Sequence, residues 1–168
     1  MELPKRKNMR LRRYDYSTNG AYFITICTEN KRHLFGEMVG AVLCGRPNSP
    51  NVMLEKWLSE VPNKYKNVQM DKYVVMPNHI HAIVLLSGGH TGPPLPEIVG
   101  WFKTMTTNEY IKGVKDGVYE PFEKRIWQRG YYDHIIRSED EYLRVWQYID
   151  ENPAKWTEDK YFSILDER

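Results

Sequence analysis

Two strand-like segments separated by only two residues constrain the fold of this chain more than any other feature. Residues 68–76 and 79–86 are rich in β-branched and apolar side chains, and the dipeptide Pro77-Asn78 between them predicts a turn. A third strand is predicted over residues 20–28, which follow the turn dipeptide Asn19-Gly20 and are also rich in aromatic residues. The chain is therefore expected to build a β-sheet.

Helical spacing appears on both sides of this pair of strands. Residues 51–66 carry apolar side chains at helical intervals, with Pro62 near the end as a kink or a stop, and residues 97–112 repeat the pattern after a Gly/Pro-rich loop. Ser138 and Glu141 form a capping box that begins a last helix, which is expected to end near Glu151.

Two further strands complete the expected order of elements. A short strand is predicted near residues 33–43 and a long one over 123–137. The resulting order of strands and helices predicts an α+β fold, close to ferredoxin-like, with helices covering an antiparallel sheet. With 168 residues, the chain is expected to form one domain over 1–168.

The sequence offers no sign of export or of membrane insertion. Its N-terminus is basic, without the apolar stretch of a signal peptide, and no apolar run approaches the roughly 20 residues of a membrane span. Cys27 and Cys44 form no CxxC pattern, which argues against a zinc site and fits a reducing compartment. We expect a cytoplasmic protein.

Positive charge is concentrated in an N-terminal arm over about residues 1–13. The arm contains one acidic residue, Glu2, and six basic ones: Lys5, Arg6, Lys7, Arg10, Arg12 and Arg13. The rest of the chain has 18 basic and 21 acidic residues. This distribution suits a polyanion, because each neutralised phosphate releases counterions, although a solubilising tail has the same composition.

The segment His79-Ile80-His81 is the first candidate for chemistry. Side chains two residues apart on a strand project from the same face, so the two imidazoles are expected to lie side by side. Two neutral imidazoles on a rigid element can hold a divalent metal ion, but two structural histidines give the same short pattern.

The second candidate lies on the C-terminal helix. Tyr142, Val145, Trp146 and Ile149 have the spacing of a buried stripe, and Tyr148 and Asn152 share one flank of it, one turn apart. A tyrosine hydroxyl in that position can serve a cleft beside the core. Equally, Tyr148 can be an amphipathic edge residue, and Asn152 a helix C-cap.

Three spaced motifs carry a resemblance to a known family. They are Val75-Met-Pro-Asn-His-Ile-His81, Ile126-Trp-Gln-Arg-Gly-Tyr-Tyr-Asp-His-Ile-Ile-Arg137 and Tyr148-Ile-Asp-Glu-Asn-Pro-Ala-Lys155. In this order they resemble the REP-associated tyrosine transposases of bacteria, relatives of the transposases of small insertion sequences within the HUH (His-hydrophobe-His) endonucleases. The arm and the first strand resemble that family as well.

The resemblance implies an enzyme and assigns roles to residues. It implies that His79 and His81 bind Mg²⁺ or Mn²⁺ and that Tyr148 is the nucleophile. Asn152 matches the third metal-ligand position, where related transposases usually have glutamine, and His134 is a rival for it. The implied substrate is a palindromic single-stranded DNA hairpin, nicked and rejoined through a 5′-phosphotyrosine. The implied state is a monomer at the nucleoid, although dimers occur among relatives.

Other residues are expected to bind the DNA. The arm is the best candidate for gripping the hairpin, and the predicted strand over 123–137 presents Trp127, Arg129 and Arg137 on one face, where a core position would equally explain its aromatic residues. Two alternatives use the same residues: a replication-initiator or relaxase-like nickase, and a hairpin-binding protein without catalysis.

Overall fold

Four antiparallel strands form the sheet of this protein in a computed structural model that describes residues 19–40, 42–44 and 47–160. The strands are β1 (Gly20–Cys27), β4 (Val68–Met76), β5 (His79–Leu86) and β6 (Tyr132–Ile136), in the spatial order β4-β5-β1-β6. Helix α1 (Pro50–Lys64) connects β1 to β4, and α2 (Leu95–Lys115) connects β5 to β6. This order and topology are ferredoxin-like, as predicted.

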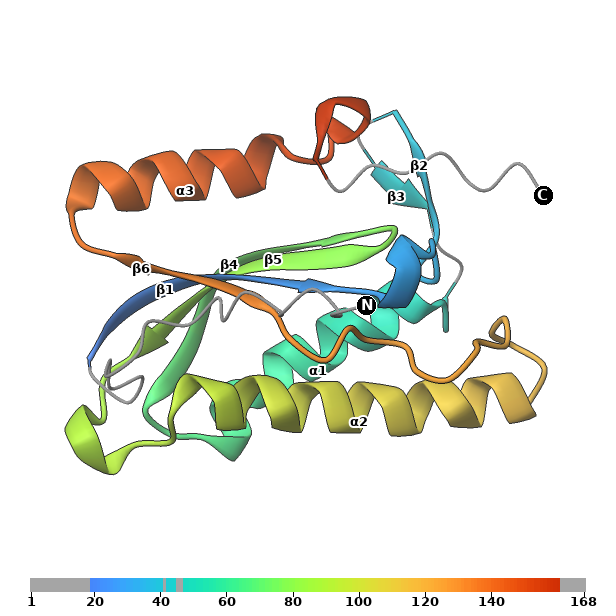
Figure 1. Cartoon of the computed structure of the whole chain (residues 1–168), viewed down its shortest axis with the longest axis horizontal. Helices are drawn as coiled ribbons and strands as arrows, with labels where there is room; N and C mark the ends of the chain where they lie inside the picture. Colours follow the sequence, from blue (N-terminus) through green and yellow to red (C-terminus); the bar gives the residue numbers. More distant parts are fainter. Residues whose placement is uncertain (1–18, 41, 45–46, 161–168) are drawn as a thin grey trace, which may run out of the picture.

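The two faces of the sheet are covered differently. Helices α1 and α2 lie on one face, and α3 (Glu139–Glu151) lies on the other (Figure 1). Alternate residues Tyr22, Ile24 and Ile26 of β1 belong to the main hydrophobic core with α1 and α2. The residues between them, Phe23 and Thr25, therefore point to the face beneath α3.

Helix α3 begins where the sequence predicts and is attached to the sheet by few contacts. The backbone N–H of Glu141 donates to Ser138 Oγ over 3.2 Å, as a capping box requires. Ile149 is its one buried residue, and Trp146 of the predicted buried stripe is 40% exposed. Polar contacts also join α3 to β4: Tyr142 donates to Asp71, and Lys72 pairs with Asp150 at 2.6 Å.

The strand predicted over 123–137 is wrong for most of its length. The regular pairing with β1 is limited to Tyr132–Ile136, and residues 123–131 run back along α2 (Figure 1), meeting the end of β1 at an isolated antiparallel bridge between Thr28 and Trp127. The alternating aromatic residues that suggested a strand have another cause. Trp127 and Tyr131 are buried in the core, and Trp127 Nε1 donates to Thr106 Oγ1 of α2 over 3.0 Å.

Smaller differences concern element ends. In place of one strand near 33–43 there is a hairpin of β2 (Glu37–Val39) and β3 (Val42–Cys44), with Gly40 at its turn in the left-handed region at φ 62°. Pro62 lies inside the last turn of α1, and α2 extends beyond both predicted ends. Short 3₁₀ turns occupy Glu29–Lys31 (η1), Gly89–Thr91 (η2) and Trp156–Glu158 (η3).

Two further expectations concern the basic arm and the absence of membrane-spanning helices. The basic arm over residues 1–13 lies outside the described residues. None of the helices in the described part combines the length and the apolar composition that crossing a bilayer requires.

Candidate active site

The two histidines of the H-x-H motif lie side by side on β5, as their spacing predicts. His79 is opposite Cys27 of β1 and His81 is opposite Thr25, so both imidazoles lie on the sheet face beneath α3. Both are fully buried. Their Nε2 atoms are 3.0 Å apart.

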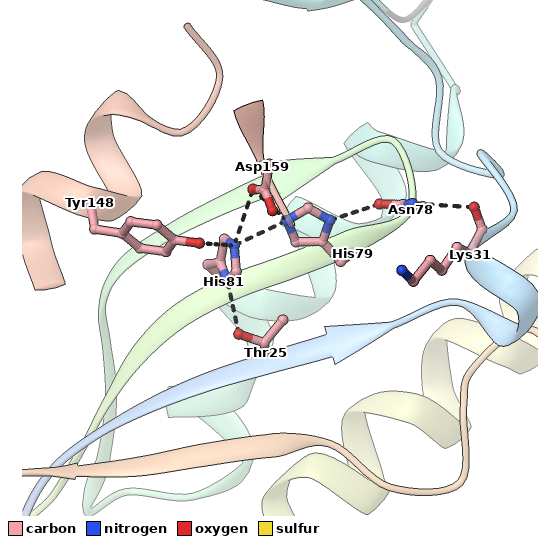
Figure 2. Close-up of polar contacts among 7 residues, drawn as sticks. All are labelled: Thr25, Lys31, Asn78, His79, His81, Tyr148 and Asp159. Carbon is pink, nitrogen blue, oxygen red and sulfur yellow. Dashed lines mark hydrogen bonds and ion pairs between the residues drawn. The ribbon is translucent and has the colours of Figure 1, made fainter. Parts of the chain in front are cut away.

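Two neighbours fix the orientation of these rings (Figure 2). Asn78 Nδ2 donates to the carbonyl of Lys31 over 3.2 Å, which turns its Oδ1 towards Nδ1 of His79 at 2.7 Å. Because Oδ1 can only accept, Nδ1 of His79 carries the proton and Nε2 keeps its lone pair. Nδ1 of His81 lies 2.8 Å from the hydroxyl of Thr25. Both Nε2 atoms therefore face the same point.

Burial keeps the imidazoles neutral at neutral pH. Loss of solvation lowers the pKa of His79 well below 6.5, and the neighbouring His81 lowers it further, although Asp159 opposes both effects. Burial likewise lowers the pKa of His81. Two neutral imidazoles with converging nitrogens are the form in which histidine binds a metal.

A carboxylate that the sequence did not reveal completes this group. Asp159 follows η3, and its Oδ2 lies 3.6 Å from Nε2 of His79 and 3.8 Å from Nε2 of His81. Its side chain is buried, and the three ligand atoms lie within 4.8 Å of one another. Trp156 of η3 helps to place this turn, because its ring packs against His79 at 5.8 Å between centroids.

Tyr148 points from α3 at the same group (Figure 2). Its Oη lies 3.5 Å from Nε2 of His81, and its ring packs edge-on against His81 and Phe23 at 5.2 and 5.9 Å. Burial of the hydroxyl end and the charge of Asp159 raise the pKa of Tyr148 to about 12, against a smaller lowering by Asn152. The residue as a whole is nevertheless 41% exposed, and the raised pKa keeps the hydroxyl protonated at neutral pH.

Asn152, one turn further along α3, lies inside the site. Asn152 is 3% exposed, and its Oδ1 is buried without a hydrogen bond to any described residue. Its amide raises the pKa of His79 and lowers the pKa of Tyr148. The predicted flank of α3 thus brings Tyr148 and Asn152 to the two histidines.

His134 does not join them. Its Nε2 pairs with Oε1 of Glu141 in the first turn of α3, and Oε2 of Glu141 accepts from the backbone N–H of Arg137 over 2.8 Å. This pair connects β6 to the start of the helix that carries Tyr148. The structure therefore places His134 as a link between β6 and α3, and His134 is not part of the group formed by His79, His81 and Asp159.

The donor set fits one divalent cation. Two nitrogens about 2.1 Å from an ion and at a right angle are about 3.0 Å apart, which is the separation observed. Asn152 Oδ1 offers a buried oxygen without a partner among the described residues, and Asp159 offers a carboxylate oxygen. Imidazole and oxygen ligands together suit Mn²⁺ better than Mg²⁺.

A cleft of about 440 Å³ opens beside Tyr148. It is lined by side chains of β1, β5, β6 and α3 and by Lys160, namely Phe23, His81, Tyr132, His134, Glu141, Arg144, Val145, Tyr148 and Lys160. Three of the residues predicted to bind DNA lie in the part of the chain that the structure describes, and their exposure differs. Arg129 and Arg137 are exposed, but Trp127 is 4% exposed and fills the core, so it cannot stack on a base.

Comparisons with known proteins show the family of this chain. Residues 16–152 match the family model of IS200-like transposases. An uncharacterised protein of Haemophilus influenzae is 32% identical over 94% of this chain and 93% of its own length.

Two solved structures share the fold. One is a REP-associated tyrosine transposase bound to a REP hairpin, at TM-score 0.60 and 22% identity over 90% of this chain and 76% of that one. The other is a putative transposase from Deinococcus radiodurans, at TM-score 0.51 and 16% identity over 84% and 95%.

Proposed function

The chain belongs to the family of IS200-like transposases, and from this we propose that it nicks and rejoins single-stranded DNA at palindromic hairpins, as a tyrosine transposase of the REP-associated kind. One observation carries the proposal. Tyr148 lines a cleft, and its hydroxyl lies 3.5 Å from Nε2 of His81, one of two buried and convergent imidazoles. A nucleophile, a metal-binding group and access for a substrate therefore meet at one point.

In the proposed reaction, Tyr148 Oη attacks the phosphorus of the scissile phosphodiester. The new O–P bond forms as the bond to the 3′ oxygen breaks, which leaves a 5′-phosphotyrosine and, after protonation, a free 3′-hydroxyl. Because the phosphodiester energy is conserved in the covalent link, a second 3′-hydroxyl can reverse the step and join two strands without ATP. The products follow from this exchange of bonds.

The proton of Tyr148 must leave during attack. The pKa of about 12 means that the phenol enters the reaction protonated, so an acceptor must take the proton as the O–P bond forms. Asp159 and Asn152 act on the pKa of this hydroxyl, and Nε2 of His81 lies 3.5 Å from it.

Mn²⁺ or Mg²⁺ would be held by His79 and His81 with Asn152 and Asp159 as oxygen donors. When bound, the ion would polarise the scissile phosphate and offset the charge that builds on it. The buried ring contacts to Asn78 and Thr25 would orient the imidazoles for that purpose.

We further propose the partner and the setting of this activity. The solved neighbour bound to a REP hairpin supports a hairpin substrate. Arginines and lysines of the arm, together with Arg129 and Arg137, would contact its phosphates. The protein would act as a monomer in the cytoplasm, at the nucleoid.

A denaturing gel tests the reaction. The protein is mixed with labelled hairpin-containing single-stranded DNA and either Mn²⁺ or EDTA, alongside Tyr148→Phe and the neighbouring Tyr142→Phe. We expect a covalent protein–DNA adduct that needs Mn²⁺, persists in Tyr142→Phe and is lost in Tyr148→Phe. If a hairpin that binds yields neither an adduct nor a nick, the chain is a hairpin-binding protein without catalysis.

A further inference from the structure

A second hollow lies between α2 and the irregular segment that precedes β6. Its volume is about 480 Å³, and the side chains that line it come from two stretches, residues 103–111 of α2 and residues 122–129. Figure 1 shows this segment running back along α2 before it enters β6. We call it the α2 groove.

The α2 groove is cationic. Four basic residues line it, Lys103, Lys124, Arg125 and Arg129, and no carboxylate does so among the described residues. The chain without its N-terminal arm carries more acidic than basic residues, so a groove with four cations and no described acid is a local separation of charge. Such a surface concentrates an anionic partner.

Its shape is fixed by the same residues. Nζ of Lys103 donates to the carbonyls of Gln128 and Gly130 over 2.8 and 2.9 Å, which ties the segment to α2. Trp127 anchors the middle of the segment in the core. The backbone of Lys124 adopts the left-handed region at φ 56°. Because the walls are held at several points, the backbone that carries the exposed Lys124 and Arg129 is held against α2.

The charged and polar part of the lining suits a phosphate backbone. Besides the four cations, the groove is lined by neutral hydrogen-bonding side chains, Thr104, Thr107, Asn108 and Gln128, and by apolar ones, Ile111, Phe122, Ile126 and Trp127. The tryptophan is buried and cannot stack on a base. The cleft at Tyr148 also has two cations, Arg144 and Lys160, but they share it with the carboxylate of Glu141. Cations with neutral hydrogen-bond donors beside them bind phosphates.

The groove also lies next to the active site along the chain. Arg129 lines the groove, and Tyr132, three residues on, lines the cleft. Three residues of chain span at most about 11 Å. The groove lies on the side of the sheet that carries α2 and the cleft on the side that carries α3, so a nucleic acid that occupies both must pass around the edge strand β6.

From these observations we infer that the α2 groove binds the phosphodiester backbone of the DNA on which the active site acts. The inference rests on the proposed function for the identity of the polyanion. It adds a binding surface made by Lys124, Arg125 and Arg129, in which the DNA is held through charge and not through its sequence.

Salt dependence of binding gives the test. Lys124→Gln/Arg129→Gln is compared with the parent chain and with Lys64→Gln/Lys66→Gln, which removes two equally exposed charges outside the groove and the cleft. Affinity for two DNA hairpins of unrelated sequence is measured by fluorescence anisotropy between 50 and 200 mM salt, a range over which phosphate contacts dominate. Circular dichroism checks that all three proteins are folded.

We expect the groove variant to bind both hairpins more weakly, by a similar factor. Each lost phosphate contact lowers the slope of log affinity against log salt by about 1, so the slope should become less steep by about 2. The control should keep the parent slope. A groove variant that keeps the parent slope, or that changes no more than the control, would overturn the inference.

The two proposals fail separately. If the parent binds hairpins but forms no adduct with Mn²⁺, the proposed catalysis is wrong. The groove inference is then still decided by the salt dependence of binding. If the parent binds neither hairpin at 50 mM salt, both proposals are wrong, because backbone contacts are independent of sequence.

Discussion

Replacement of Asn78 by alanine is the most informative perturbation of the proposed metal group. Asn78 is 1% exposed, and its amide bridges the carbonyl of Lys31 and Nδ1 of His79. Removing the amide leaves the Nδ1–H of His79 buried without its acceptor and frees the ring to rotate. A buried group left unsatisfied costs about 1–3 kcal/mol, and partners of metal-bound histidines typically contribute 10–100-fold in metal affinity.

We therefore expect Asn78→Ala to weaken Mn²⁺ binding by about 10–100-fold. Asn78→Asp keeps an acceptor for Nδ1 and should retain most of the affinity, since a carboxylate also orients a metal-bound histidine. The matched control is Asn63→Ala, because that amide is exposed on α1 and contacts Glu60. The assay is titration of Mn²⁺ followed by electron paramagnetic resonance of the free ion, with thermal unfolding to check the fold.

Equal Mn²⁺ affinity for the parent and Asn78→Ala would refute this reasoning, provided that the variant is folded. It would mean either that His79 does not bind the ion through Nε2 or that its orientation has another cause. If Asn78→Asp loses as much Mn²⁺ affinity as Asn78→Ala, the effect belongs to the contact between the Asn78 amide and the carbonyl of Lys31.

Three further predictions test neighbouring parts of the structure. Ile149→Ala should lower the free energy of unfolding by about 2–5 kcal/mol in a urea titration, because Ile149 is fully buried, whereas the exposed Leu143→Ala should change it by less than about 0.5 kcal/mol; equal effects would contradict the described docking of α3. His134→Ala should keep the Mn²⁺ affinity of the parent but slow adduct formation severalfold, since His134 links β6 to α3. Loss of Mn²⁺ binding would instead indicate that His134 is a metal ligand. Burial raises the pKa of the Cys27 thiol to about 11, so its alkylation at pH 8, followed by mass spectrometry of its peptide, should be roughly 100-fold slower than for an ordinary thiol, and an ordinary rate would contradict the described burial.

The sequence predicts the parts of the site that lie on regular elements. Side chains two residues apart on a strand share a face, which brings His79 and His81 together, and residues four apart on a helix share a flank, which pairs Tyr148 with Asn152. The capping box at Ser138 sets where the helix begins and hence which flank faces the sheet. The order of strands and helices was sufficient for the ferredoxin-like topology.

What the sequence missed lies on irregular backbone. Asp159 follows a 3₁₀ turn, where no periodicity relates its position to β5. Residues 123–131 alternate like a strand because Trp127 and Tyr131 reach the core from an irregular segment, and periodicity does not separate these two cases. Asn78 was interpreted as a turn residue, and its contact with His79 depends on the carbonyl of Lys31, 47 residues away.

Trp146 illustrates a limit of the helical stripe. It has the spacing of a buried residue, yet Ile149 is the one buried residue of α3, and Lys72 Nζ lies 3.9 Å from the Trp146 ring centroid. A stripe predicts which residues share a side of a helix. How closely that side approaches the sheet depends on the partner surface, here the outer strand β4.

Mass spectrometry of the covalent adduct tests the central claim most directly. Trypsin separates Tyr142 and Tyr148 into the peptides 138–144 and 145–155, and each peptide contains one tyrosine. After reaction with a hairpin DNA and Mn²⁺, followed by nuclease and trypsin digestion, we expect the nucleotide mass on peptide 145–155, attached to Tyr148. A nucleotide on any other peptide, or an adduct that forms equally in EDTA, would contradict the account.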